Sequence, residues 1–292
     1  MATSAALPSR VAAGAGFAGA SPVVVARDLA ASYGRRPVWS AATFDVAPGE
    51  FVAILGPNGG GKSTLFRLLL GLLRPAAGSL FVLGGPPHRG NPAIGYVPQR
   101  RPIDPELRLA GTEFVKLGLT GHRWGTGLPG KRREVDRQVA EAVAAVGADS
   151  FADEAVGTMS GGELQRLMLA QAIISQPRLL LLDEPLGSLD LRNQAGVVQL
   201  VAGVARARSI AVLLIAHDVN PLLPALDRVM YVARGKLTVG RPDVVITSEH
   251  LSQLYDANVE VLSDSRGRLF VVGLDDEVAH PHDRDHGAPG SG

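Results

Sequence analysis

The sequence contains no cysteine and almost no excess of charge, because its 29 lysine and arginine residues nearly balance 28 aspartate and glutamate residues. Without cysteine there is no disulfide framework and no thiolate metal site, which fits a reducing compartment. A net charge of +1 leaves no electrostatic footprint for nucleic acid, so we expect no nucleic-acid partner. The small basic clusters at 100–101 and 131–133 are interpreted as solvated surface.

Apolar runs long enough to cross a bilayer are also missing. The best candidate, from Leu65 to Leu73, is short and carries Arg67, whereas a spanning helix needs about 20 apolar residues. The first twenty residues are rich in alanine and glycine, but Pro8 and Gly14 interrupt any continuous apolar core, so we expect no signal peptide. We expect residues 1–22 to form a disordered extension.

Apolar residues make up 46% of the 292 positions, enough for one large domain with a subdomain and tails. Continuous or alternating apolar runs predict strands at 23–33, 38–46, 51–55, 179–182 and 210–216, with helical patterns between them. Strands that alternate with helices predict an α/β fold whose ligands lie at the C-terminal ends of parallel strands.

Residues from about 100 to 160 interrupt this alternation. They contain no convincing strand, and an amphipathic stretch from Glu134 to Val146 predicts an inserted helical subdomain. Near the end, the segments 259–262 and 268–272 predict a hairpin within a C-terminal extension that spans 246–275. Residues 276–292 are expected to be a disordered tail that contains histidines.

A phosphate-loop pattern, G-x-x-x-x-G-K-[ST], follows the apolar run 51–55 and precedes a helical pattern. Its residues are Gly56, Pro57, Asn58, Gly59, Gly60, Gly61, Lys62 and Ser63. Glycines allow backbone N–H groups to converge on an anion at a helix N-terminus. The pattern predicts that Lys62 reaches the β- and γ-phosphates and that Ser63 binds Mg²⁺, the alternative being a glycine-rich turn that only caps a helix.

The helix that follows the phosphate loop is predicted to be amphipathic. Leu65, Leu68, Leu69 and Leu72 recur at the spacing of one helix face. We expect this helix to continue until Pro75 and Gly78 end it.

A second glycine-opened helix is predicted at Ser160-Gly161-Gly162-Glu163. Locally the pattern is a capping box, with Ser160 as N-cap and Glu163 bonding back to it. Two glycines in a first turn cost about 1 kcal/mol each relative to alanine, a cost expected where another molecule must approach the backbone. We therefore interpret this helix start as a second anion-binding element.

These motifs resemble those of the ATP-binding-cassette (ABC) ATPases. The run 159–166 resembles their signature motif, 179–185 their Walker B segment and 187–190 their D-loop, all in family order. Gln99 resembles the Q-loop glutamine, and His217 the switch histidine. The resemblance covers residues 23–245, with Met159 and Glu163 as mild departures that remove no group needed for hydrolysis.

The resemblance implies a P-loop NTPase fold: a central mostly parallel sheet, an antiparallel β subdomain and an inserted α-helical subdomain. It implies catalytic roles for Lys62, Gln99, Glu184 as general base and His217. It assigns Mg²⁺ to Ser63, Gln99 and Asp183. The residues expected to bind ATP are Tyr33, which stacks on adenine, the phosphate-loop residues Gly56 to Ser63 given above, Thr64, Ser160, Gly161, Gly162, Glu163 and Asp190.

In this family two ATPase domains pack head-to-tail around ATP, so a homodimer is implied. An integral-membrane permease is the implied partner, with an extracytoplasmic substrate-binding protein if the system is an importer. The chain would then be cytoplasmic, peripheral on the inner face of the membrane. The alternatives are a non-transport soluble ABC ATPase in translation or DNA maintenance, and a transporter subunit for another substrate.

Three parts of the sequence further resemble the ATPases of zinc and manganese importers: 160–166, 216–221, and 254–255 followed by 259–262. The tail adds His280, His282 and His286, a composition that fits either a transition metal or a flexible solvated end. We therefore expect import of zinc or manganese.

Overall fold

A computed structural model of the chain describes residues 21–99, 104–120, 132–187, 189–255, 258–264 and 269–272. The extension predicted at 1–22 lies outside the described residues except for its last two, and the tail predicted at 276–292 lies wholly outside them. Within the described ranges, no helix combines the length and the apolar character that a membrane crossing needs.

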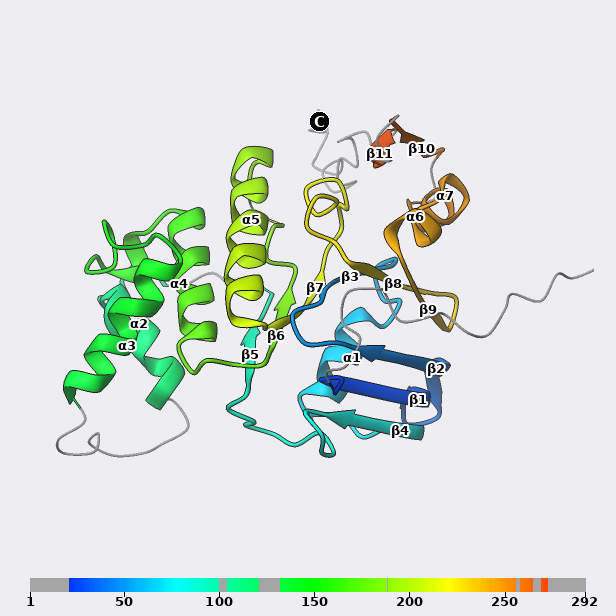
Figure 1. The fold of residues 1–292 in the computed structure, drawn as a ribbon, viewed down its shortest axis with the longest axis horizontal. Helices are drawn as coiled ribbons and strands as arrows, with labels where there is room; N and C mark the ends of the chain where they lie inside the picture. The colour runs from blue at the N-terminus through cyan, green and yellow to red at the C-terminus, as the bar shows by residue number, and fades with distance from the viewer. Residues whose placement is uncertain are drawn as a thin grey trace, which may run out of the picture.

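A six-stranded sheet forms the centre of the molecule, in the order β5-β6-β7-β3-β8-β9 (Figure 1). Its strands are β3 (Phe51–Leu55), β5 (Ile94–Val97), β6 (Leu179–Asp183), β7 (Ala211–Ile215), β8 (Arg228–Ala233) and β9 (Lys236–Gly240). All neighbouring pairs are parallel except β8 and β9. The predicted mostly parallel sheet is confirmed, and the sequence patterns had indicated β3, β6 and β7 but not the other three strands.

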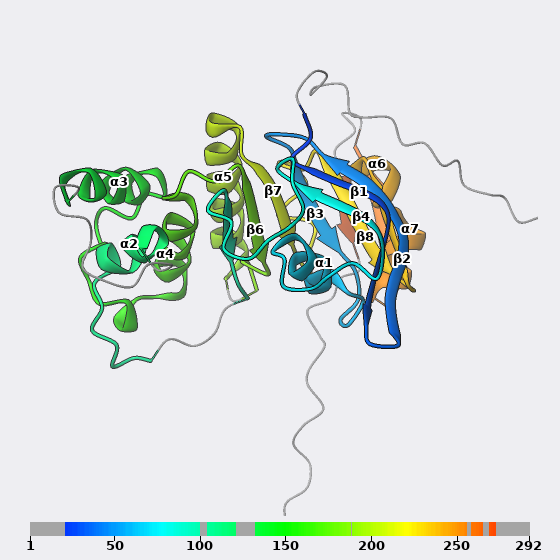
Figure 2. The same cartoon turned by 90° about the horizontal axis from the view of Figure 1, so that it is seen from below.

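A three-stranded antiparallel sheet lies below it, in the order β2-β1-β4. Its strands are β1 (Val24–Tyr33), β2 (Arg36–Val46) and β4 (Ala77–Val82), of which the first two were predicted. Figure 2 shows helix α1 (Lys62–Leu69) between this sheet and the central one. The prediction that this helix runs to Pro75 is wrong: it ends at Leu69, and Gly71 follows at φ 67° against the backbone of His88.

The central sheet separates two apolar cores, because side chains alternate along each strand. Val52 and Ile54 of β3 face α1 and the antiparallel sheet, whereas Phe51, Ala53 and Leu55 face the other helices. All five residues are buried, as expected for a parallel strand covered on both faces. Leu72, predicted to lie on the buried face of α1, is 50% exposed because the helix has already ended.

A group of helices stands to one side of the central sheet (Figures 1 and 2). It contains α2 (Gly111–Thr120), α3 (Arg132–Ala145) and α4 (Gly161–Ile173), with a 3₁₀ turn at Val156–Thr158. Helices α2 and α3 lie within the segment from about 100 to 160 for which the sequence predicts an inserted helical subdomain, and α4 begins directly after it. Helix α5 (Leu191–Arg208) connects β6 to β7. Its Val197, Val198 and Val201 pack into the core between the central sheet and this group of helices.

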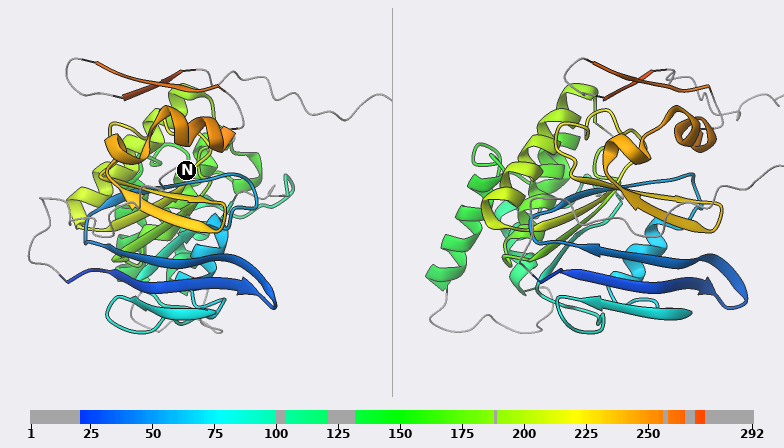
Figure 3. Two further views of the ribbon diagram at one scale, coloured as in Figure 1. Left: turned by 90° about the vertical axis from the view of Figure 1, so that its right-hand side faces the viewer. Right: turned by 45° about the vertical axis from the view of Figure 1, so that its right-hand side comes forward.

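The C-terminal part adds α6 (Pro242–Val245), α7 (Ser248–Tyr255) and a separate hairpin of β10 (Glu260–Ser263) with β11 (Leu269–Val272). The antiparallel pairing of Glu260 with Val272 and of Ser263 with Leu269 confirms the predicted hairpin. Figure 3 shows this hairpin at the same end of the molecule as α6 and α7.

Candidate active site

The phosphate loop lies between the end of β3 and the start of α1, as the sequence predicts. Gly61 is the N-cap of α1 and has φ 102°, in the left-handed region that favours glycine. A Cβ atom at this position would meet the indole of Trp39 at 2.8 Å, and the Trp39 Nε1–H donates to the Gly61 carbonyl at 3.3 Å. Strand β2 therefore fixes the loop from one side and requires glycine there.

The Lys62 ammonium curls back over its own loop. Its Nζ donates to the carbonyl oxygens of Gly56 at 2.5 Å and Pro57 at 3.2 Å. Burial lowers the pKa of Lys62, while the nearby charges of Glu184 and Asp183 act in the opposite direction. A buried cation at a helix N-terminus, beside a loop of backbone N–H groups, forms a strong anion site.

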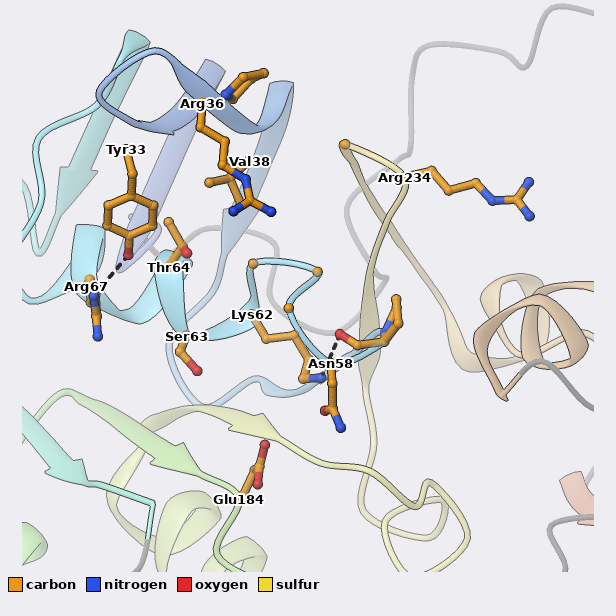
Figure 4. A pocket seen from close by; sticks show the side chains of 16 residues that line it. Tyr33, Arg36, Val38, Asn58, Lys62, Ser63, Thr64, Arg67, Glu184 and Arg234 are labelled. Carbon is orange, nitrogen blue, oxygen red and sulfur yellow. Dashed lines mark hydrogen bonds between the residues drawn. The ribbon is translucent and has the colours of Figure 1, made fainter. Parts of the chain in front are cut away.

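A cavity of about 790 Å³ opens over this loop (Figure 4). The predicted residues that line it are Tyr33, Pro57, Asn58, Gly59, Gly60, Gly61, Lys62, Ser63, Thr64 and Glu184. The lining residues that the sequence patterns did not indicate are Arg36, Pro37, Val38, Arg67, Arg234 and Gly235. This volume is within the range of cavities that hold a cofactor-sized ligand.

Tyr33, at the end of β1, is 43% exposed and is held by Arg67. The Arg67 guanidinium donates to the Tyr33 hydroxyl at 3.1 Å and lies 5.9 Å from the ring centroid. Arg67 could have been found from the sequence, because it stands four residues after Ser63 and so shares its helix face. The exposed ring at the cavity rim is suited to stacking on a flat base.

Three side chains meet at the C-terminal ends of three neighbouring strands, β5, β6 and β7. Gln99 Nε2 donates to Glu184 Oε2 at 2.6 Å, and His217 Nε2 lies 2.9 Å from Glu184 Oε1. Glu184 has φ 51°, an uncommon conformation for a residue other than glycine, and its N–H donates to the Ile215 carbonyl at 3.1 Å. This left-handed turn carries the carboxylate toward the phosphate loop, as Figure 4 shows.

Asp183, one residue before, is 7% exposed and differs from Glu184 in its surroundings. Burial raises the pKa of Asp183, and the Glu184 charge raises it further, whereas Lys62 and a hydrogen bond with Tyr96 lower it. Its Oδ1 has no hydrogen-bond partner among the described residues. A buried carboxylate oxygen without a hydrogen-bond partner matches the oxygen ligands that a hard divalent cation prefers.

The predicted capping box at the start of α4 is confirmed. Ser160 Oγ accepts from the Glu163 N–H at 3.4 Å, and Glu163 Oε2 accepts from the Ser160 N–H at 2.8 Å. Hydrogen bonds to the Glu163 carboxylate from the Ser160 side chain and from the Ser160 backbone lower the pKa of Glu163. A Cβ atom added to Gly162 would meet no described residue within 4 Å, so packing against the described part of the chain does not require that glycine.

The described lining of the cavity does not include Ser160, Gly161, Gly162, Glu163 or Asp190. Asp190 instead caps α5, where its Oδ1 accepts from the Asn193 N–H at 2.9 Å. One chain thus brings together the phosphate loop, Tyr33 and Glu184 with its partners Gln99 and His217. The glycine-opened start of α4 is not part of this cavity lining. The N–H groups of the first turn of α4 have no acceptors within the helix.

Comparison with known proteins places these features in a family. Residues 40–187 match the family described as "ABC transporter". The "Zinc import ATP-binding protein ZnuC" of Cereibacter sphaeroides is 36% identical over 233 residues, which are 80% of this chain and 88% of that protein. The protein of the same name from Paramagnetospirillum magneticum is 33% identical over 89% of this chain and 88% of its own length.

Solved structures show the same fold. A "putative metal-chelate type ABC transporter" in an inward-facing conformation matches with a TM-score of 0.73 and 26% identity, over 86% of this chain and 96% of that chain. An ATP-binding cassette in its ADP conformation matches with a TM-score of 0.71 over 81% of this chain and 99% of that chain, and at 19% identity it supports the fold alone.

Proposed function

Because the chain belongs to the ABC transporter family, whose members couple ATP hydrolysis to transport, we propose that it is the ATPase subunit of a zinc importer. The observation that carries the ATPase assignment is the cavity in which Glu184, held by Gln99 and His217, faces the phosphate loop. The choice of zinc is supported by relatives with that name that match 80–89% of the chain.

ATP is proposed to bind with its phosphates on the loop and its base beside Tyr33. The Lys62 ammonium, now bonded to carbonyl oxygens of its own loop, would turn to the β- and γ-phosphates, which are stronger acceptors. Arg67 would keep the Tyr33 ring in place. Ser63, Asp183 and the Gln99 amide oxygen would hold Mg²⁺, which supplies neutralisation of phosphate charge.

Hydrolysis needs a water molecule aligned with the γ-phosphate and a base to take its proton. We assign the base to Glu184, whose carboxylate oxygen would accept the proton as the water oxygen bonds to phosphorus and the bond to the leaving ADP oxygen breaks. Gln99 and His217 each bond one oxygen of this carboxylate and so fix its orientation. Each oxygen retains a lone pair for the water.

A second copy of the chain is proposed to complete the site. The N–H groups of Gly161 and Gly162 at the start of α4 and the open space beside Gly162 suit an approaching phosphate, and neither glycine is among the described residues that line the cavity of its own chain. In a head-to-tail dimer, Ser160, Gly161 and Gly162 of one copy would close the cavity of the other, with Glu163 and Asp190 near the contact. A separate membrane permease, and an extracytoplasmic zinc-binding protein that delivers zinc to it, would then complete the importer.

The test of the ATPase assignment is the Glu184→Gln variant of the full chain. It keeps the shape of the side chain and both neighbours but removes the base, so we expect ATP to bind normally and phosphate release to fall by about 10²-fold or more. Glu154→Gln, an exposed position in the helical subdomain, is the matched control and should hydrolyse at the wild-type rate. Wild-type turnover by Glu184→Gln would overturn the assignment.

Zinc transport is tested separately in host cells that lack this chain. Cells that regain the wild-type chain should accumulate radioactive zinc and grow in chelated medium, whereas cells with Glu184→Gln should do neither. Added zinc should rescue the deletion, and added manganese should not. Normal zinc uptake by the deletion strain, or rescue by manganese alone, would contradict the proposed substrate.

A further inference from the structure

The loop that follows β7 carries His217 and, three residues later, Asn220, whose side chain is also hydrogen-bonded. Asp218 Oδ1 accepts a hydrogen bond from the Asn220 N–H at 2.9 Å, and Val219 between them is 0% exposed. This hydrogen bond and the burial of Val219 fix the loop backbone directly after His217. The side chain of Asn220 is therefore presented from a rigid support.

Asn220 pairs with the backbone of Val271 in β11, 51 residues away in sequence. Its Nδ2 donates to the Val271 carbonyl at 3.3 Å, and the Val271 N–H donates to its Oδ1 at 3.2 Å. A carboxamide presents the same donor and acceptor as a peptide group, so Asn220 occupies the place of a neighbouring strand on the outer edge of the hairpin.

The opposite edge of the hairpin, formed by β10, is hydrogen-bonded to α7 at the residue that pairs with Val271. Val261 is the residue directly across from Val271, and its N–H donates to Ser248 Oγ of α7 at 2.9 Å. Ser252 Oγ bonds both the N–H and the carbonyl of Val259, which is 1% exposed. The hairpin is thus clamped between α7 and the loop of His217, at the end of the molecule shown in Figure 3.

We propose that Asn220 is a positioning residue for ATP hydrolysis: its pairing with Val271 uses the C-terminal hairpin to hold the 217–220 loop so that His217 stays beside Glu184. The inference rests on the proposed roles of His217 and Glu184. Because 49% of the His217 side chain is exposed, burial restrains the ring only partly, and the position of its backbone matters correspondingly more. The hairpin thereby keeps the backbone of the 217–220 loop in the position that ATP hydrolysis requires.

The test compares steady-state and single-turnover ATP hydrolysis by full-length Asn220→Ala, Asn220→Asp and His217→Ala. Asn220→Asp is nearly isosteric but loses the donor and places a charge against the Val271 carbonyl. We expect both Asn220 variants to lower kcat by about tenfold, because a small displacement of a catalytic group has a large effect on rate. The dissociation constant of ATP should stay within about twofold of wild type, since Asn220 does not line the cavity. Asn258→Ala, an exposed asparagine of the same extension, is the control.

A double variant separates positioning from a general structural effect. If Asn220 acts through His217, Asn220→Ala should cause no further loss in the His217→Ala background, which single-turnover assays with labelled ATP can follow. Equal losses in both backgrounds, weakened ATP binding, or wild-type kcat in Asn220→Ala would each overturn the inference. If His217→Ala and Glu184→Gln themselves hydrolyse normally, the proposed function fails instead.

Discussion

Replacing Asp183 with asparagine should make the nucleotide-free protein more stable while removing most of its stabilisation by Mg²⁺ and ATP. Asp183 is 7% exposed, and its Oδ1 finds no hydrogen-bond partner in the part of the chain that the structure describes. Burial raises its pKa, and the charge of Glu184 adds to this effect. Asparagine has nearly the same shape, and its oxygen can still accept the hydrogen bond from Tyr96 while the charge is gone.

The size of the effect follows from the buried charge, because asparagine keeps polar atoms at this position but has no charge to desolvate. A buried polar group without a partner costs about 1–3 kcal/mol, and more when charged. Attraction to Lys62 recovers part of this cost, so we expect a gain of about 1–2 kcal/mol. For a chain of this size each kcal/mol moves Tm by about 2–4 °C, so Asp183→Asn should melt about 2–8 °C higher.

The pH dependence has a definite sign. A folded-state pKa raised above the unfolded value means that the folded protein holds this proton more tightly, so stability falls as pH rises from the unfolded pKa through the folded one. Asparagine does not titrate. The stability advantage of Asp183→Asn should therefore be full at neutral pH and shrink as the solution is made acidic.

The assay is urea unfolding and differential scanning fluorimetry at pH 7 and in acid, with and without Mg²⁺ and ATP. Wild type should gain about 2.7 kcal/mol at a ligand concentration of 100 Kd, and Asp183→Asn much less at the same concentration. Asp153→Asn, an exposed position, should behave as wild type throughout. A nucleotide-free Asp183→Asn that melts below wild type, or one that Mg²⁺ and ATP stabilise equally, would refute the reasoning.

Two further predictions concern single residues of the proposed ATP site. Arg67→Met should weaken ATP binding by about three- to tenfold with little change in kcat, because Tyr33 loses the hydrogen bond and the cation–π contact that orient its ring. Titration with a fluorescent ATP analogue measures the affinity, and an unchanged affinity would contradict the prediction. Gly162→Ala should leave the monomer as stable or raise its free energy of unfolding by up to about 1 kcal/mol, since its Cβ would meet open space in a helix. The same change should impair ATP-dependent dimerisation in the Glu184→Gln background, measured by sedimentation, and a dimer of wild-type affinity would argue against α4 as the contact.

Local motifs were predictable because their physical causes lie within a few residues. The phosphate loop and the capping box of Ser160 and Glu163 depend on backbone conformation and on side chains three residues apart, and both form as predicted. Strand β5 was missed because it has only four residues and contains Gly95. That glycine is required by the close approach of the Ala172 carbonyl in α4, a tertiary contact that no local pattern encodes.

The paired carboxylates at the end of β6 show where sequence reasoning stops. A buried strand followed by Asp183 and Glu184 predicts two acidic groups at the edge of the sheet, one facing inward and one available to solvent. It does not predict that Glu184 turns to φ 51°, which the Ile215 carbonyl holds by accepting its N–H. That turn brings one carboxylate to Gln99 and His217, which follow the neighbouring strands on either side. Because the strained residue is held by three neighbours at once, a change in any of them should be felt first in the orientation of Glu184 and only secondarily in ATP affinity.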